Sequence, residues 1–175
     1  MTGAMGSVAH DLARSAIDFA FILLVLWAIV SDFLKLRIPN SVSVGMVLLF
    51  VAFMVLLRPS PPWTSHLAAF ALVFAISLLL FYFNAMGGGD VKFLAATSLW
   101  VGLSALPSFL VVVALLGGAV SLLLLAIRLY TRRFAAASIP ASLRPGQPVP
   151  YGVAIGGAAL VLQYTTEFSK YFAGP

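Results

Sequence analysis

The sequence predicts an all-α membrane protein, a bundle of about six transmembrane helices that forms a single domain over residues 1–175. Its composition supports this prediction, because 62% of the residues are hydrophobic and only 9% are charged. A soluble domain carries about a quarter charged residues, since its surface faces water. One span needs roughly 20 apolar residues, so six spans fill most of the chain and leave no segment for a sizeable soluble domain.

Apolar runs bounded by Pro, Gly and charged residues give the expected helices in order. The first run is interpreted as a retained helix and not as a signal peptide, because Asp11 and Asp18 lie before or within it and no small-residue cleavage site follows. A Gly-rich segment, residues 84–90, separates the third run from the fourth, and Pro107 ends the fourth. The expected helices cover residues 17–33, 41–57, 65–83, 91–106, 108–129 and 150–166.

Positive charges predict the orientation of this bundle, because Lys and Arg concentrate in cytoplasmic loops. If the loop after the first helix is cytoplasmic, that side holds seven of the ten Lys and Arg residues. Both termini then lie outside, residues 130–149 form a cytoplasmic loop, and Asp32 and Asp90 lie together on the cytoplasmic side. The seven residues are Lys35, Arg37, Lys92, Arg128, Arg132, Arg133 and Arg144. They lie in loops and helix flanks and form no dense stripe, so no nucleic-acid partner is expected despite the net charge of +5.

Two of the five acidic residues, Asp32 and Asp90, lie at the edges of apolar runs. An ionisable group at such a depth is a candidate functional residue. Each also has a simpler explanation. Asp32 could be an interfacial carboxylate that Lys35 or Arg37 neutralises, and Asp90 could be the N-cap of the fourth helix.

The residues before Asp90 favour the functional interpretation. Gly87, Gly88 and Gly89 lose chain entropy on folding and contribute no packing, so their use is to let the backbone approach another group closely. A carboxylate beside such a backbone suits a peptide-cleaving site, where main-chain contacts hold the substrate extended. A turn or a close helix contact would explain the glycines, but neither needs the aspartate.

A pair of carboxyls can share one proton. The ionised carboxyl takes a proton from water, and the protonated one polarises the scissile carbonyl. Helix dipoles predict which is which, because Asp32 lies at a helix C-terminus, where an anion is disfavoured, and Asp90 at a helix N-terminus, where it is favoured. The expected resting state has the proton on Asp32 and the negative charge on Asp90.

Other catalytic classes fit the sequence less well. The absence of cysteine removes cysteine nucleophiles and thiolate metal sites. His10 and His66 are expected on the outer side, away from the aspartates, and no metallopeptidase spacing occurs. The chain also lacks a G-x-S-x-G segment. Neither a metal nor another cofactor is expected.

Three segments carry a resemblance to a known family. They are DFLKLRIPN at residues 32–40, GGGDVKF at residues 87–93 and PYGVAI at residues 150–155. Together they resemble the type IV prepilin peptidases, which belong to the Gly-x-Gly-Asp intramembrane aspartic proteases. The chain has neither a cysteine-containing cytosolic insertion nor any cysteine. It is therefore similar to the short, peptidase-only form that serves tight-adherence (Flp-type) pilus systems.

This resemblance implies a function and a set of site residues. Asp32 and Asp90 would be the catalytic pair, with no metal required. The enzyme would cleave the leader from prepilin or pseudopilin precursors at the cytoplasmic face of the bacterial inner membrane, and methyltransferase activity is not carried over. Other residues in the three segments are expected to position the substrate, namely Gly87, Gly88, Gly89, Lys92, Arg37, Pro39, Asn40, Tyr151 and Gly152.

Two other functions stay open at this point. The first is a small proton-coupled membrane transporter, in which the two buried carboxyls relay protons. The chain shows one Gly-rich helix break but no internal repeat, which makes this alternative weaker. The second is a non-catalytic assembly subunit that keeps the peptidase fold. The sequence predicts neither the oligomeric state nor the exact precursor.

Overall fold

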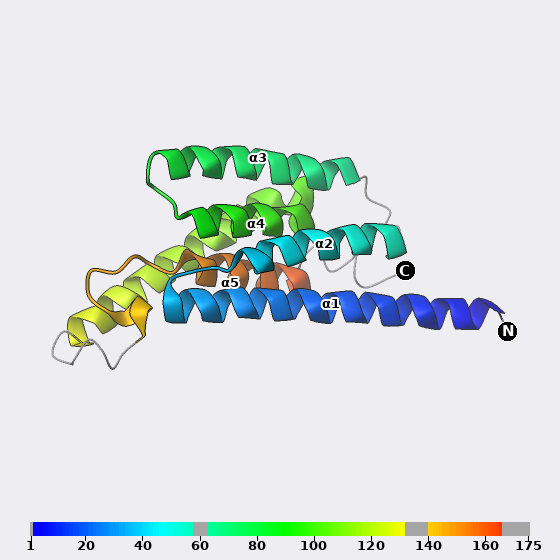
Figure 1. Ribbon diagram of the computed structural model, residues 1–175, viewed down its shortest axis with the longest axis horizontal. Helices are drawn as coiled ribbons and strands as arrows, with labels where there is room; N and C mark the ends of the chain where they lie inside the picture. Colours follow the sequence, from blue (N-terminus) through cyan, green and yellow to red (C-terminus); the bar gives the residue numbers. More distant parts are fainter. Residues whose placement is uncertain (1, 58–62, 132–139, 166–175) are drawn as a thin grey trace.

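The computed structural model describes residues 2–57, 63–131 and 140–165, and these residues contain helices and loops but no strand (Figure 1). Four of the described helices are long and apolar enough to cross a membrane, and α5 is a shorter apolar helix. The prediction of an all-α, multi-pass membrane protein is therefore confirmed. The elements are α1 (Thr2–Lys35), α2 (Asn40–Leu57), α3 (Trp63–Tyr82), α4 (Gly88–Thr131), the short 3-10 helix η2 (Ala141–Leu143) and α5 (Tyr151–Thr165).

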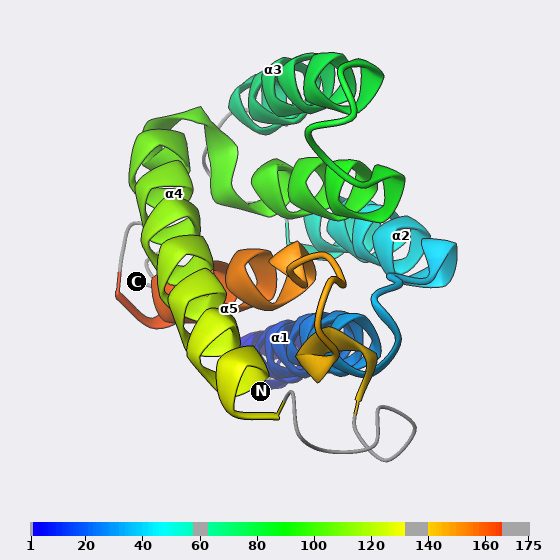
Figure 2. The ribbon, with the colours of Figure 1, turned by 90° about the vertical axis from the view of Figure 1, so that its left-hand side faces the viewer.

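The long helix α4 is broken at Gly102, whose backbone has φ 72° and ψ 169°. Only glycine adopts this conformation readily, because a Cβ would clash with the backbone. The break divides α4 into two segments that run in different directions (Figure 2). With α1, α2, α3 and α5, the described residues thus form six apolar helical segments.

The predicted helix end at Pro107 is wrong, because the break lies earlier, at Gly102. Pro107 lies inside the second segment of α4, five residues after the break. A single glycine inside an apolar run gives little indication of a helix break, whereas a proline is a strong indication. The sequence therefore predicted the break at the wrong residue.

Side chains of α3 satisfy the backbone groups that this break leaves unpaired. Nδ1 of His66 donates to the carbonyl oxygen of Leu99 over 2.9 Å, and the N–H of Leu103 donates to Oγ of Ser65 over 3.2 Å. In a bilayer such groups find no water, so their partners must come from the protein. His66 is accordingly buried at 4% exposure.

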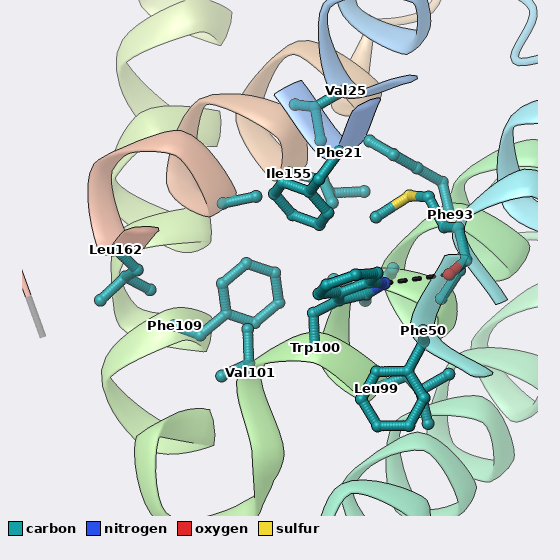
Figure 3. Close-up of a cluster of buried hydrophobic side chains, with 14 of the residues drawn as sticks. Phe21, Val25, Phe50, Phe93, Leu99, Trp100, Val101, Phe109, Ile155 and Leu162 are labelled. Atoms are coloured by element: carbon teal, nitrogen blue, oxygen red, sulfur yellow. Dashed lines mark hydrogen bonds between the residues drawn. The ribbon is translucent and has the colours of Figure 1, made fainter. Parts of the chain in front are cut away.

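Trp100 lies at the centre of the core and joins three helices (Figure 3). Its ring centroid lies 4.8 Å from that of Phe21 on α1 and 5.5 Å from that of Phe50 on α2. Its indole N–H donates to the carbonyl oxygen of Met46 over 3.1 Å. A buried tryptophan needs such a partner for its N–H group. The first segment of α4 is thereby held against α1 and α2.

The remaining helix boundaries differ from the expected ones chiefly at α1. This helix begins at Thr2 and not near residue 17, and it extends beyond the rest of the bundle (Figure 1). Hydropathy locates the part of a helix that can cross the bilayer but not where the helix begins. Helix α4 begins at Gly88, three residues before the expected start at residue 91, so its first turn contains Asp90. Residues 58–62, 132–139 and 166–175 lie outside the described residues.

We expect Gly102→Ala to destabilise the protein by about 1–3 kcal/mol, because alanine is strained at this φ and ψ. A Cβ at this position would also lie 3.2 Å from Cε1 of His66. Thermal unfolding of the purified protein in detergent would measure the effect. Gly118→Ala is the matched control, because a Cβ there meets nothing within 4 Å. If the two variants unfold at the same temperature, the conformation at Gly102 is not needed for the fold.

Candidate active site

A cleft of about 440 Å³ lies at one end of the bundle, where α1 ends, α3 turns into α4 and the chain enters α5 (Figure 1). Asp32 from α1 and Asp90 from α4 both line it. The structure thus brings together the two acidic residues that the sequence singled out. The other residues that line the cleft are Leu36, Phe81, Asn84, Ala85, Met86, Gly87, Pro148, Val149 and Tyr151.

Asp32 lies in the last turn of α1 and is 5% exposed. Its Oδ2 accepts a hydrogen bond of 2.7 Å from the backbone N–H of Gly152, in the first turn of α5. That N–H group has no partner within its own helix, since the first turn of any helix leaves its donors unpaired. The hydrogen bond therefore satisfies the start of α5 and also fixes the orientation of the Asp32 side chain.

Gly152 is the residue that makes this contact sterically possible. A Cβ at this position would lie 2.8 Å from Oδ2 of Asp32 and 3.1 Å from Cβ of Asp32. It would also lie 2.7 Å from Cδ1 of Ile38. The Ile38 methyl group could move aside, but the Asp32 Cβ is fixed to the backbone of α1. Only glycine lets α5 approach Asp32 this closely.

Asp90 lies in the first turn of α4 and is partly buried. The glycines before it bring the backbone close to three different groups. A Cβ at Gly87 would lie 2.9 Å from Oδ2 of Asp90, and one at Gly88 would lie 3.4 Å from the ring of Phe81. A Cβ at Gly89 would lie 3.5 Å from Cβ of Ile38. The Gly-rich run thus allows close packing around Asp90.

The helix dipoles do not distinguish the two aspartates as the sequence argument expected. That argument placed Asp32 at the C-terminus of one helix only. In the structure the N-terminus of α5 also faces Asp32, through the N–H of Gly152. Asp32 therefore meets the C-terminus of its own helix and the N-terminus of α5, whereas Asp90 lies at the N-terminus of α4 only. The N-terminus of α5 opposes the dipole of α1, so the dipole argument by itself no longer assigns the proton to Asp32.

Two turns with unusual backbone angles border the cleft. Leu36 has φ 52° and Asn84 has φ 58°, and both residues line the cleft. Asparagine tolerates this left-handed backbone conformation, and an asparagine in it commonly ends a helix. Leucine does so at a cost, which the surrounding contacts must offset. The N–H of Leu36 donates to the carbonyl oxygen of Asp32 over 2.8 Å, so this turn is tied to the residue that carries the carboxyl.

Not all of the residues expected to position a substrate lie at the cleft. Gly87 and Tyr151 line it, and Gly88, Gly89 and Gly152 pack directly behind it. The side chain of Arg37 is exposed and its carbonyl oxygen accepts a hydrogen bond from Ser31, while the carbonyl oxygen of Pro39 accepts one from Val42. Arg37 and Pro39 thus form the turn into α2 and do not line the cleft.

Lys92 and Asn40 belong to a different feature. Nζ of Lys92 donates to Oδ1 of Asn40 over 3.1 Å. Both residues line a mostly apolar groove of about 430 Å³ between α2, α3 and the first segment of α4. Asp90 and Lys92 are two residues apart on one helix, so their side chains point to different sides.

Sequence reasoning missed Ile38 and Arg128. Ile38 is 7% exposed and packs between Gly89 and Gly152, behind both aspartates. It belongs to the segment of residues 32–40 that was singled out, but its apolar side chain suggested only packing. Arg128 was interpreted as a topology signal, and the structure shows that it binds the loop before α5.

The arrangement is suited to acid–base chemistry by two carboxyls. They lie in a cleft with helix N-termini and closely approaching backbone around them. Among the residues that the structure describes, no three His, Cys, Asp or Glu side chains form a group that could hold a metal ion.

Comparisons with known proteins give one match. No curated protein and no solved structure matches the chain significantly. The model of the type IV leader peptidase family matches residues 19–122, a range that contains both Asp32 and Asp90. This range covers more than half of the chain, so the protein belongs to the type IV leader peptidase family.

Proposed function

We propose that this protein is an aspartic endopeptidase that removes the leader peptide of type IV, Flp-like prepilins at the cytoplasmic face of the bacterial inner membrane. One observation carries the proposal. Asp32 and Asp90 come from helices far apart in the sequence, yet they line one cleft in a chain of the leader peptidase family. Few acidic residues occur in this chain, and two of them share one site.

The proposed mechanism uses a water molecule between the two carboxyls. One carboxylate removes a proton from this water, and the protonated partner donates a hydrogen bond to the carbonyl oxygen of the scissile peptide. Two negative charges in one cleft repel each other, so in this mechanism the pair shares one proton. The water oxygen adds to the carbonyl carbon, and proton transfer to the amide nitrogen then releases the new N-terminus.

The walls of the cleft supply the contacts for an extended substrate. Gly87 offers backbone groups without a side chain to shield them, and Tyr151 lines the cleft with a side chain that is 43% exposed. The apolar part of the substrate enters laterally from the bilayer. Lys92 and Asn40 contact this part through the groove between α2, α3 and α4.

The distribution of charge supports a cytoplasmic position for the cleft. In the described part of the chain, one basic residue, Arg14, lies on the N-terminal half of α1, far from the cleft. The other described Lys and Arg residues lie at the cleft end of the bundle, as expected for a cytoplasmic face. They are Lys35, Arg37, Lys92, Arg128 and Arg144.

We expect Asp32→Asn and Asp90→Asn each to lower the rate of precursor cleavage by about 10²- to 10⁴-fold, because either change removes one member of the acid–base pair. The measurement is cleavage of a co-expressed Flp-type prepilin, followed by gel shift and N-terminal sequencing. Asp11→Asn is the matched control, because Asp11 is an exposed carboxylate on α1 outside the cleft.

Membrane insertion of Asp32→Asn and Asp90→Asn must be shown separately. If either inserted variant cleaves at nearly the wild-type rate, the two carboxyls do not act as a pair. If the wild type cleaves no precursor but conducts protons in liposomes, and both variants lose this flux, the proton-coupled transporter is the better explanation.

Gly152→Ala is expected to lower cleavage by about 10²-fold while the protein still inserts, because the new Cβ displaces Asp32 and a catalytic group moved by about 1 Å loses activity on this scale. Gly157→Ala on the same helix is the control, since a Cβ there would meet only the terminal Cδ1 of Leu116, at 3.2 Å. Initial cleavage rates of the two purified variants provide the comparison. Equal activity of the two would mean that the close approach of α5 to Asp32 is not required.

A further inference from the structure

The loop that leads into α5, residues 140–150, is held by one side chain of α4. Nε and Nη2 of Arg128 donate to the carbonyl oxygen of Ser142 over 3.0 and 2.7 Å. Nη2 also donates to the carbonyl oxygen of Pro148 over 2.9 Å. The guanidinium group thus joins two points of this loop to the last turn of α4.

The anchored loop also has contacts of its own, since the N–H groups of Leu143, Arg144 and Gln147 donate to carbonyl oxygens within it. It contains prolines at 140, 145, 148 and 150, which have no backbone N–H group to donate. Ser142 is fully buried in η2, which packs between α1 and α4. Hydrogen bonds from a charged donor are stronger than neutral ones, and a planar guanidinium can bind two acceptors in fixed directions. Arg128 therefore supplies charge-assisted hydrogen bonds at two points of this loop.

The loop is also a wall of the active-site cleft. Pro148 and Val149 line the cleft beside Asp32 and Asp90. The second carbonyl that Arg128 binds belongs to Pro148, only four residues before Gly152, whose N–H donates to Asp32. Pro148 and Gly152 thus join the Arg128 contact to the Asp32 contact through a short stretch of backbone.

We propose that Arg128 is a positioning residue of the active site, which acts by clamping residues 142–148 so that the start of α5 holds Asp32 in its catalytic orientation. The effect of this clamp on precursor cleavage rests on the proposed peptidase function, whereas the clamp itself can be measured independently of it. A merely topological role for Arg128 as a cytoplasmic positive charge would require none of these contacts.

A spin label on the loop tests the clamp directly. The chain contains no cysteine, so Gln147→Cys introduces one labelling site. Gln147 is exposed and lies between the two clamped carbonyl groups. In full-length protein reconstituted in lipid, we expect the label to become clearly more mobile with Arg128→Ala. With Arg128→Lys it should become partly mobile, because an ammonium group lacks the two-pronged geometry. Lys35→Ala is the control, since it removes one positive charge from an exposed site at the same end of the bundle.

The same variants, without the label, test the effect on cleavage. We expect Arg128→Ala to lower cleavage of the Flp-type prepilin about ten- to a hundredfold, and Arg128→Lys to restore part of it. Thermal unfolding of each variant shows whether it is folded, and if Arg128→Ala is not, Arg128→Lys and Arg128→Gln replace it. An unchanged label spectrum in folded Arg128 variants overturns the proposal, and so does a mobile label with wild-type cleavage. If the wild type itself cleaves no prepilin, the peptidase function fails, and the label alone then supports or overturns the clamp.

Discussion

Backbone N–H and C=O groups inside a bilayer have no water to pair with, so each interruption of a helix in this protein needs partners from another part of the chain. At Gly102 the partners are His66 and Ser65 on α3. At the entrance to α5, which lies at the cleft end of the bundle and not in its interior, Arg128 and Asp32 bind backbone groups in the same way. These pairings tie distant segments together, and the candidate active-site cleft lies where α5 begins, beside two of them.

The contact between Asp32 and Gly152 serves the fold and the site at once. It satisfies the first turn of α5, and it also holds a carboxyl in one orientation facing the cleft. A side chain fixed in this way needs little rearrangement when a substrate binds, which is the general advantage of a preorganised site. The absence of side chains at Gly87 and Gly152 has the same effect, because it lets backbone surround the carboxyls at short distance.

Part of this site could be predicted because charged groups are expensive in an apolar chain. Asp32 and Asp90 were identifiable for that reason, and the Gly-rich run beside Asp90 marked a close approach of the backbone. Other features depended on how the helices pack. Lys92 lies two residues after Asp90 on the same helix, so its side chain faces a different side, toward a separate groove. Asn40, from the matching segment of residues 32–40, lines the same groove. The helix break was expected at Pro107 because proline is the stronger local signal, although tertiary contacts support the break at Gly102.

The sequence by itself determined the membrane class, the approximate positions of the apolar helices and the identity of the two unusual aspartates. These properties depend on composition and on local periodicity, which a linear chain displays directly. Only the tertiary structure decided that Gly152 reaches Asp32, that Ile38 packs behind both aspartates and that Arg128 holds the loop before α5. Such contacts join residues far apart in the sequence, and their geometry depends on how whole helices pack. No local pattern therefore records them.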